Sequence, residues 1–276
     1  MAIRSNLLAE GVEDIISSVL SSTADEVLVV NPTAEVIEGL VTVATSLDDG
    51  DHPTIRLVAD EPVLKDVMDD FIVASNAADL IVAETLSLRT AQDDVENTLF
   101  VTPNSVVALV GAGGKVAGLV TDDEAFVETA FEAHHERWED APEFKLRTPA
   151  LSRVRETLAE DINEETLTDF DAVLGSLSSA RGDGDGLDEV TISLLVAARN
   201  NVLLYDISKW GEDVGIASKA TFSRTKTKLE DTGLIDTEKV PIDVGRPRLR
   251  LKLGDDRLAD AENDELAGIA QELLAA

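Results

Sequence analysis

Six consecutive residues near the C-terminus, Arg248 to Leu253, alternate strictly between cationic side chains and leucine. Successive side chains of a β-strand point to opposite faces, so the three leucines would face a core and the three cations would face outward. Val240, Ile242 and Val244 alternate with polar residues just upstream, and Gly245-Arg246-Pro247 separates the two stretches with turn-forming residues. The pattern therefore predicts a two-stranded ribbon with a basic outer edge.

Three helical patterns precede this ribbon. Asp188, Asp206 and Ser218 are placed to cap the first, second and third helix, and Leu203–Tyr205 predicts a very short strand between the first two. Gly233 follows the third helix as a stop signal. The apolar positions expected to face inward are Val190, Leu194, Ala197, Ala198, Ile207, Trp210, Phe222 and Leu229. This order of elements predicts a winged helix-turn-helix domain over residues 187–254.

The chain is strongly acidic, and this segment is an exception. The 276 residues carry 55 acidic and 23 basic side chains, a net charge of −32, yet 44% of residues are hydrophobic, which indicates a folded protein with an acidic surface. Such a composition is typical of halophilic proteins. From Ser218 to Leu253 there are nine basic and five acidic side chains, net +4, which leaves 14 basic and 50 acidic elsewhere, net −36. The local reversal of charge indicates a polyanionic partner.

In DNA-binding domains of this kind, the third helix and the wing make the contacts. We expect the start of the third helix to enter the major groove, Lys226 and Lys228 to lie near the phosphates, and Arg246 and Arg248 to reach the backbone or the minor groove from the wing tip. The predicted DNA-binding residues are Ser218, Lys219, Thr221, Ser223, Arg224, Lys226, Lys228, Arg246 and Arg248. At molar salt the Debye length is about 3 Å, so direct phosphate contacts and shape must carry the affinity.

A second interpretation belongs to a different functional class. The chain would be a ligand sensor or adaptor that does not bind DNA, and its winged helix would contact protein. Ion pairs between these cations and the protein's own carboxylates would favour this alternative, because they would compete with phosphates.

Residues 1–145 alternate strand-like and helix-like patterns and predict an α/β domain. The expected strands are Glu26–Val30, Thr54–Val58, Leu80–Ala83, Leu99–Thr102, Ser105–Val110 and Lys115–Val120, the last two paired as a hairpin. The expected helices are Asn6–Ser22, Thr33–Ser46, Pro62–Ala74 and Asp122–Trp138. The last helix would bury one stripe formed by Phe126, Ala130, Phe131, His134 and Trp138.

Two further segments complete the chain. Residues 146–186 predict a helical connector, with one helical stretch over Thr148–Leu177, followed by a flexible linker rich in Gly, Ser and Asp. Residues 255–276 predict a C-terminal helix with an apolar stripe of Leu258, Ala261, Leu266, Ile269, Ala270, Leu273 and Leu274. The stripe could cover its own domain or pair with a second copy. We expect a homodimer, because pairing uses the whole stripe.

The N-terminal pattern from Asp25 to Asp140, with its late hairpin and closing helix, resembles the phospholipase-D-like half-fold that serves as an effector domain in archaeal sugar-responsive regulators. The catalytic version of that fold requires a histidine with a lysine two residues later. His52, His134 and His135 all lack this neighbour, so the resemblance implies a domain without catalytic activity. We therefore expect that the protein is not an enzyme.

Other motifs point away from metal and cofactor chemistry. The chain has no cysteine, which excludes disulfides and thiolate metal sites. The stretch Gly111–Lys115 resembles a phosphate loop, but Val116 follows the lysine, so a hairpin turn is the better interpretation. His134 and His135 are adjacent and cannot both face one site from a helix. We expect no metal and no cofactor.

A small-molecule metabolite is a possible partner of the N-terminal domain. Asn31–Thr33 and Asp60–Pro62 follow strands, where open α/β sheets commonly bind ligands, although both are also ordinary helix starts. The residues that would bind such an effector are not assigned. No signal peptide and no membrane-spanning run is recognisable, so we expect a cytoplasmic protein without a membrane partner.

Two stretches carry a resemblance to a known family. Leu203–Asp213 (LLYDISKWGED) and Lys239–Arg248 (KVPIDVGRPR) are similar to the haloarchaeal TbsP transcriptional regulators, and the resemblance spans most of the chain. It implies a sequence-specific DNA-binding regulator of sugar metabolism, linked to glycolysis and gluconeogenesis.

Overall fold

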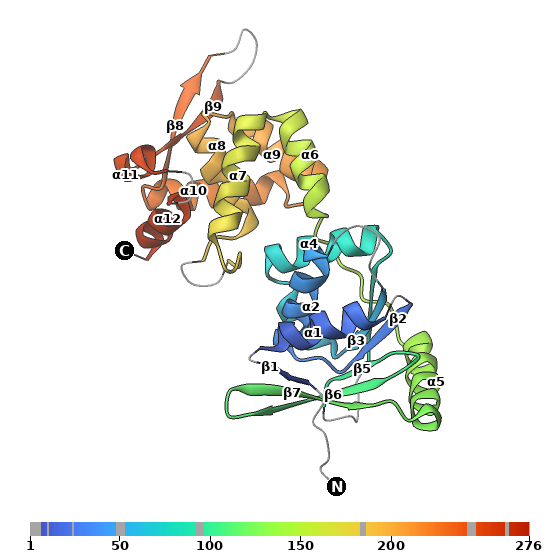
Figure 1. The fold of residues 1–276 in the computed structure, drawn as a ribbon. Helices are drawn as coiled ribbons and strands as arrows, with labels where there is room; N and C mark the ends of the chain where they lie inside the picture. Colours follow the sequence, from blue (N-terminus) through green and yellow to red (C-terminus); the bar gives the residue numbers. More distant parts are fainter. Residues whose placement is uncertain are drawn as a thin grey trace. The chain divides into compact units, whose positions relative to one another are not determined.

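The computed structural model divides the chain into two compact units (Figure 1). The N-terminal unit comprises Met1–Asp69 and Asn76–Leu146, and the C-terminal unit comprises Asp70–Ser75 and Arg147–Ala276. The structure describes residues 7–9, 11–23, 25–47, 53–91, 97–182, 186–241, 247–262 and 265–275.

The N-terminal unit is built on a seven-stranded mixed sheet with strand order β1-β7-β6-β5-β2-β3-β4. The strands are β1 (Leu7–Ala9), β2 (Glu26–Val30), β3 (Thr54–Ala59), β4 (Leu86–Thr90), β5 (Leu99–Val101), β6 (Val106–Ala112) and β7 (Lys115–Thr121). β2, β3 and β4 are parallel, whereas β5, β6, β7 and β1 continue the sheet with antiparallel pairs. The predicted hairpin is confirmed as β6 and β7, with Gly113 and Gly114 at positive φ in the turn.

The helices of this unit follow from the alternating pattern. They are α1 (Val12–Ser22), α2 (Ala34–Ser46), α3 (Glu61–Val67), α4 (Phe71–Val82), whose first residues up to Ser75 belong to the C-terminal unit, and α5 (Glu124–Asp140). α1 and α2 pack on each other, and α5 lies against β2, β3 and β5 (Figure 1). The predicted α/β class is therefore confirmed.

Two of the predicted element types are wrong in this unit. Leu80–Ala83 is not a strand: Leu80 to Val82 end α4, and the strand of this region is β4. A short apolar run fits a buried helix as well as a strand, and here the residues before it continue the helix. The residues 7–9 within the predicted first helix form β1, which pairs with β7, and α1 begins only at Val12.

The predicted helix Pro62–Ala74 is divided in two by a capping carboxylate. Asp70 is 3% exposed, and its Oδ1 accepts hydrogen bonds from the backbone N–H of Ile72 at 2.9 Å and of Val73 at 3.4 Å. Such a side chain begins a new helix, so α3 ends at Val67 and α4 starts at Phe71.

The buried stripe of α5 also differs from the prediction. Phe126 is 55% exposed, whereas Val127 is 2% exposed and packs with Leu28, Val101 and Val106 of the sheet. The residues that support this contact from α5 are Ala130, Phe131 and Trp138. The predicted stripe is therefore correct at Ala130, Phe131 and Trp138 and wrong at Phe126, where the next residue, Val127, faces the sheet instead.

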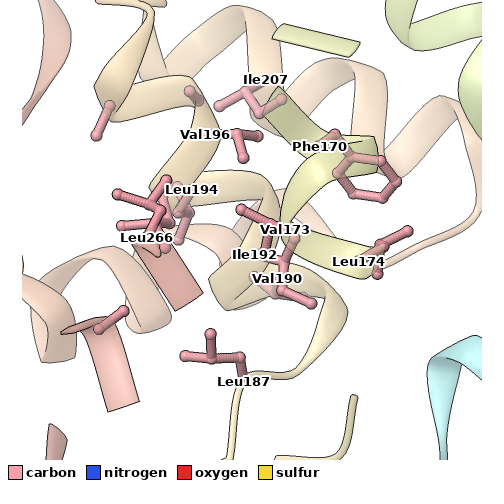
Figure 2. Close-up of a cluster of buried hydrophobic side chains, with 14 of the residues drawn as sticks. Phe170, Val173, Leu174, Leu187, Val190, Ile192, Leu194, Val196, Ile207 and Leu266 are labelled. Carbon is pink, nitrogen blue, oxygen red and sulfur yellow. The ribbon is translucent and has the colours of Figure 1, made fainter. Parts of the chain in front are cut away.

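The C-terminal unit is helical with one small ribbon. Its elements are α6 (Leu151–Asp161), α7 (Glu164–Ser176), α8 (Glu189–Arg199), α9 (Leu204–Val214), α10 (Lys219–Asp231), β8 (Ile235–Val240), β9 (Arg248–Leu253), α11 (Asp256–Asp260) and α12 (Leu266–Leu274). Figure 2 shows its core, in which α8 is central and Phe170, Val173, Ile207 and Leu266 converge on it from neighbouring helices. This arrangement confirms the predicted helix-turn-helix region followed by a ribbon and a terminal helix.

Residues 146–186, expected to connect two domains, are mostly part of the C-terminal unit. They form two helices, because Asn163 caps α7 by accepting from the N–H of Thr166 at 2.8 Å. Val154, Leu158 and Phe170 are fully buried in the same core as α8. The start of the expected linker is packed as well: Ala180 is buried, and its carbonyl accepts from the N–H of Phe71 at 3.1 Å. Residues 183–185 lie outside the described residues.

The apolar stripe of the C-terminal helix covers its own domain. Leu258, Leu266 and Ala270 are fully buried, and Ile269 and Leu273 pack against the same core. The argument that favoured a homodimer through this stripe is therefore wrong, since the unit itself supplies the covering surface through α7 and β9. None of the described helices is long and apolar enough to cross a membrane.

Candidate nucleic-acid interface

The third helix of the motif, α10, is anchored by its buried side and capped as predicted. Phe222 and Leu229 are 0% and 1% exposed, and the Ser218 Oγ accepts from the N–H of Thr221 at 3.2 Å. Gly215, in the left-handed region with φ 98°, makes the turn between α9 and α10. The side chains between the two anchors consequently point away from the core.

Several predicted contact residues lie together on the exposed side of α10. Ser218, Lys219, Ser223, Arg224 and Lys228 are exposed. Thr221 is half-buried, and its Oγ1 lies 3.0 Å from the Ser218 Oγ and accepts from the Arg224 guanidinium at 3.4 Å. The hydroxyl groups and the guanidinium at the start of α10 thus form one hydrogen-bonded group that can donate hydrogen bonds to an acceptor on a ligand.

The wing is attached to the motif by the backbone. β8 and β9 pair antiparallel, the N–H of Leu251 donates to the carbonyl of Val202 at 2.9 Å, and Leu203 forms a single bridge with Arg250. That bridge replaces the short strand expected at Leu203–Tyr205, where α9 begins at Leu204. Asp206, expected as a cap, is in the first turn of α9.

The register of the ribbon settles which face each residue takes. Leu251 is fully buried and pairs with Thr237, while Arg250 pairs with Glu238 and Lys252 with Asp236 on the outer face. The outward direction of the cations on β9 is thus confirmed. Val240 pairs with Arg248 and so belongs to this outer face. Ile242, Val244 and the predicted contact residue Arg246 lie outside the described residues.

Four of the eight described cations between Ser218 and Leu253 are paired with carboxylates of the protein itself. The pairs are Lys219–Glu212 at 2.7 Å, Lys226–Glu230 at 2.6 Å, Arg248–Asp206 at 3.5 Å and Lys252–Glu238 at 2.7 Å. The other four, Arg224, Lys228, Lys239 and Arg250, have no carboxylate of a described residue within 4 Å. Half of the described cations therefore form ion pairs with the protein's own carboxylates, and such pairs favour the adaptor alternative.

The pairs differ in how firmly they hold the cation. The side chains of Lys219, Arg248 and Lys252 are 44%, 41% and 45% exposed, and exposed ion pairs contribute about 0–1 kcal/mol, so a phosphate can replace the carboxylate. Lys226 is only 12% exposed, and its partner Glu230 also accepts from the Thr237 Oγ1 at 2.8 Å. Glu230 thus links α10 to β8, and Lys226, held by this carboxylate and largely buried, is unsuited to the predicted phosphate contact.

The pair at the start of α10 is tuned by direct hydrogen bonding. The side-chain hydrogen bond to the Glu212 carboxylate raises the pKa of Lys219, and the same hydrogen bond from the Lys219 ammonium lowers the pKa of Glu212. Both groups therefore stay charged across neutral pH. The Lys252 ammonium likewise lowers the pKa of Glu238.

Two functional candidates at the wing were not found from the sequence. The Arg248 guanidinium lies over the Tyr205 ring, 4.5 Å from its centroid, and beside Asp206. Tyr205, the single tyrosine of the chain, is 47% exposed. These residues belong to α9, so only the folded wing brings them to Arg248.

Two of the predicted motifs have structural roles, at His135 and at Gly111–Lys115, whereas His52 lies outside the described residues. The Arg56 guanidinium lies 2.6 Å from the Nε2 of His135, and Arg56 and Arg89 both lie over the Trp138 ring, at 4.6 and 3.8 Å. Gly111–Lys115 spans the β6–β7 turn. Within the described part of the chain, no three His, Asp or Glu side chains form a cluster that could hold a metal ion.

Comparisons with known proteins agree with this architecture. Residues 4–149 match the model described as "Transcriptional regulator TbsP-like, N-terminal", and residues 150–271 match "Transcriptional regulator TbsP-like, C-terminal HTH domain". A search of curated proteins finds no match.

Two solved structures are similar at low identity. One is TrmBL2, an archaeal chromatin protein described as showing a novel mode of DNA binding, with 15% identity and a TM-score of 0.38 over 52% of this chain and 56% of that chain. The other is the phospholipase D family member Nuc from Salmonella typhimurium, with 13% identity and a TM-score of 0.34 over 48% of this chain and 90% of that chain. The two family models together span nearly the whole sequence, and the chain belongs to the TbsP-like transcriptional regulators.

Proposed function

We propose that α10 and the wing bind double-stranded DNA sequence-specifically, and that the protein thereby regulates genes of sugar metabolism in a halophilic archaeon. The observation that carries the proposal is the exposed group of Ser218, Lys219, Ser223, Arg224 and Lys228 on one helix of a chain with a net charge of −32. Cations kept at one place on an acidic protein favour a polyanionic partner. The sugar-metabolism context comes from the resemblance of the sequence to the haloarchaeal regulators.

The test is DNA binding by the full chain at high salt. Genomic occupancy by immunoprecipitation first supplies a bound fragment, and gel shifts in molar KCl then compare the wild type with Lys219→Ala/Arg224→Ala. We expect the double variant to bind at least tenfold more weakly, because direct contacts carry the affinity when screening is strong. Lys65→Ala/Lys115→Ala is a matched control, since it removes two exposed cations from the N-terminal unit.

Equal binding by the wild type and the Lys219/Arg224 variant would contradict the proposal. The own-protein ion pairs at Lys219 and Arg248 favour the second candidate, an adaptor whose winged helix contacts protein. That function predicts genomic occupancy that is unchanged in the variant or absent in the wild type.

Two further properties complete the proposal. The protein acts in the cytoplasm, where its DNA target lies, and as a homodimer, which suits a palindromic site. We expect the dimer surface on the N-terminal unit, where the apolar side chains of Val110, Leu119 and Phe126 are exposed. Light scattering after size exclusion tests it: a dimeric mass is expected for the wild type, and a monomeric mass would refute it.

A further inference from the structure

The N-terminal unit contains a cavity of about 650 Å³ at the end of β2. Leu109 and Gly111 of β6 and Val116 of β7 line it from the sheet, and Val12 of α1 lies on another side. The first turn of α2, with Thr33 and Glu35, and the helix α3, with Pro62 and Asp66, complete the lining. The volume lies within the range of about 300–1,000 Å³ of small-molecule sites.

The cavity lies at the edge of the sheet where β2 ends. β2 pairs with β3 in parallel on one side and with β5 antiparallel on the other, so the parallel and antiparallel parts of the sheet meet at β2. In open α/β sheets, small molecules commonly bind beyond the carboxyl ends of parallel strands. Asn31, the residue after β2, lines the cavity in the left-handed region with φ 49°, and its carbonyl accepts from the Thr98 Oγ1 at 3.0 Å.

The lining has a definite chemistry. Its charged members among the described residues are the carboxylates of Glu35 and Asp66, and no lysine or arginine is among them. Further hydrogen-bonding groups come from Asn31, Asn97 and Thr98, while the sheet side is apolar. Carboxylates and carboxamides accept from hydroxyl groups, and an apolar floor suits the C–H face of a ring.

This lining disfavours a phosphate ester. A dianion would lie near two carboxylates without a described cation to neutralise it. The N-terminus of α2 offers little compensation, because Thr33 accepts from the N–H of Val36 at 3.4 Å and Glu35 lies in the first turn.

We propose that this cavity binds an uncharged polyhydroxylated metabolite and rejects its phosphorylated form. The inference rests on the proposed function only in the further step that such a ligand acts as an effector of DNA binding. Binding itself is a property of the N-terminal unit and is measured separately.

The experiment is calorimetric titration of the full chain in molar KCl with a panel of small molecules. Glucose, fructose and glycerol are the uncharged members, glucose 6-phosphate and fructose 6-phosphate the anionic ones, and glucosamine the cationic one. We expect saturable binding of at least one uncharged member and at least tenfold weaker binding of its phosphate ester.

Two substitutions on one strand locate the site. A side chain at Gly111 would enter the cavity, and a Cβ there meets no atom within 4 Å, so Gly111→Leu should fill the space without disturbing the fold. Ala112 is exposed on the opposite face of β6 and does not line the cavity, so Ala112→Leu is the matched control. Gly111→Leu should weaken binding at least tenfold, and Ala112→Leu should leave it unchanged.

Three results would overturn the inference: no saturable heat from any uncharged member, tighter binding of a phosphate ester or of glucosamine, or equal binding by Gly111→Leu and wild type. A gel shift on the same samples separates this outcome from a failure of the proposed function. If the wild type binds DNA but none of the uncharged members, the cavity proposal is contradicted, and if it binds an uncharged member but no DNA, the nucleic-acid interface is contradicted.

Discussion

Gly211 of α9 lies directly against the ring of Phe222 of α10, so closely that no Cβ fits between them. Phe222 is fully buried, and the ring therefore fixes how closely the two helices of the motif approach. The direction in which α10 presents its exposed side chains depends on this contact.

Replacing this glycine should loosen the motif. Gly211→Ala would force the Phe222 ring out of place, and overpacking of this kind costs about 1–3 kcal/mol. We expect a lower melting temperature together with weaker DNA binding. Gly175→Ala, in α7, is the control, since a Cβ there has no neighbour within 4 Å and the change should be neutral or slightly stabilising. Unchanged stability of Gly211→Ala would show that the two helices can separate freely.

Removing the carboxylate beside Lys219 should strengthen DNA binding. Glu212→Gln leaves the Lys219 ammonium without its partner at 2.7 Å, so its charge becomes available to a phosphate, and we expect affinity to rise severalfold in fluorescence anisotropy. Glu61→Gln, which removes the partner of Lys65 in the N-terminal unit, is the matched control. A similar gain from both variants would mean that net charge alone is responsible.

The gain from Glu212→Gln should not depend on pH near neutrality. Glu212 has its pKa lowered below 4.5 and Lys219 has its pKa raised above 10.5. The carboxylate loses its charge only as the pH falls through that lowered value, and the ammonium only as it rises through the raised one. Anisotropy at pH 6, 7 and 8 should therefore give the same ratio of variant to wild type. A ratio that changes steadily over this range would contradict the pairing.

Lys226 and Lys228 should respond differently to the same substitution. Lys226→Met removes the half-buried partner of Glu230, so we expect a loss of about 1–2 kcal/mol in chemical denaturation. Lys228→Met should leave stability unchanged and reduce the slope of log affinity against log salt by about 0.9, the value for one phosphate contact. If Lys228→Met lost stability and Lys226→Met reduced the salt slope instead, the roles assigned to the two lysines would be reversed.

The ring of Tyr205 should keep the Arg248 guanidinium in the position from which it contacts DNA. Tyr205→Ala removes the stacking partner of the guanidinium, and we expect a severalfold loss of DNA affinity with little change in stability. Tyr205→Phe keeps the ring and should bind like the wild type. If both variants lose affinity equally, the hydroxyl group rather than the stacking is responsible.

Local patterns predicted the C-terminal motif well, because its signals involve neighbouring residues. Ser218 caps α10, Phe222 and Leu229 are buried at a seven-residue interval, and alternation on β9 sends its cations outward. Each of these features depends only on backbone geometry and on the polarity of residues a few positions apart. The same reasoning failed at Leu80–Ala83, where a short apolar run leaves helix and strand equally possible.

The amino-acid sequence by itself determined an acidic two-part protein with a helix-turn-helix region, a wing and one cationic segment. The tertiary structure alone decided which of those cations are held by carboxylates, that the C-terminal stripe covers its own core, and that Asn31 and Asp66 line one cavity. The reason is physical: composition and periodicity follow from residues that are near in the chain. Ion pairs, covering surfaces and cavities instead depend on residues far apart in the sequence, which only the folded chain brings together.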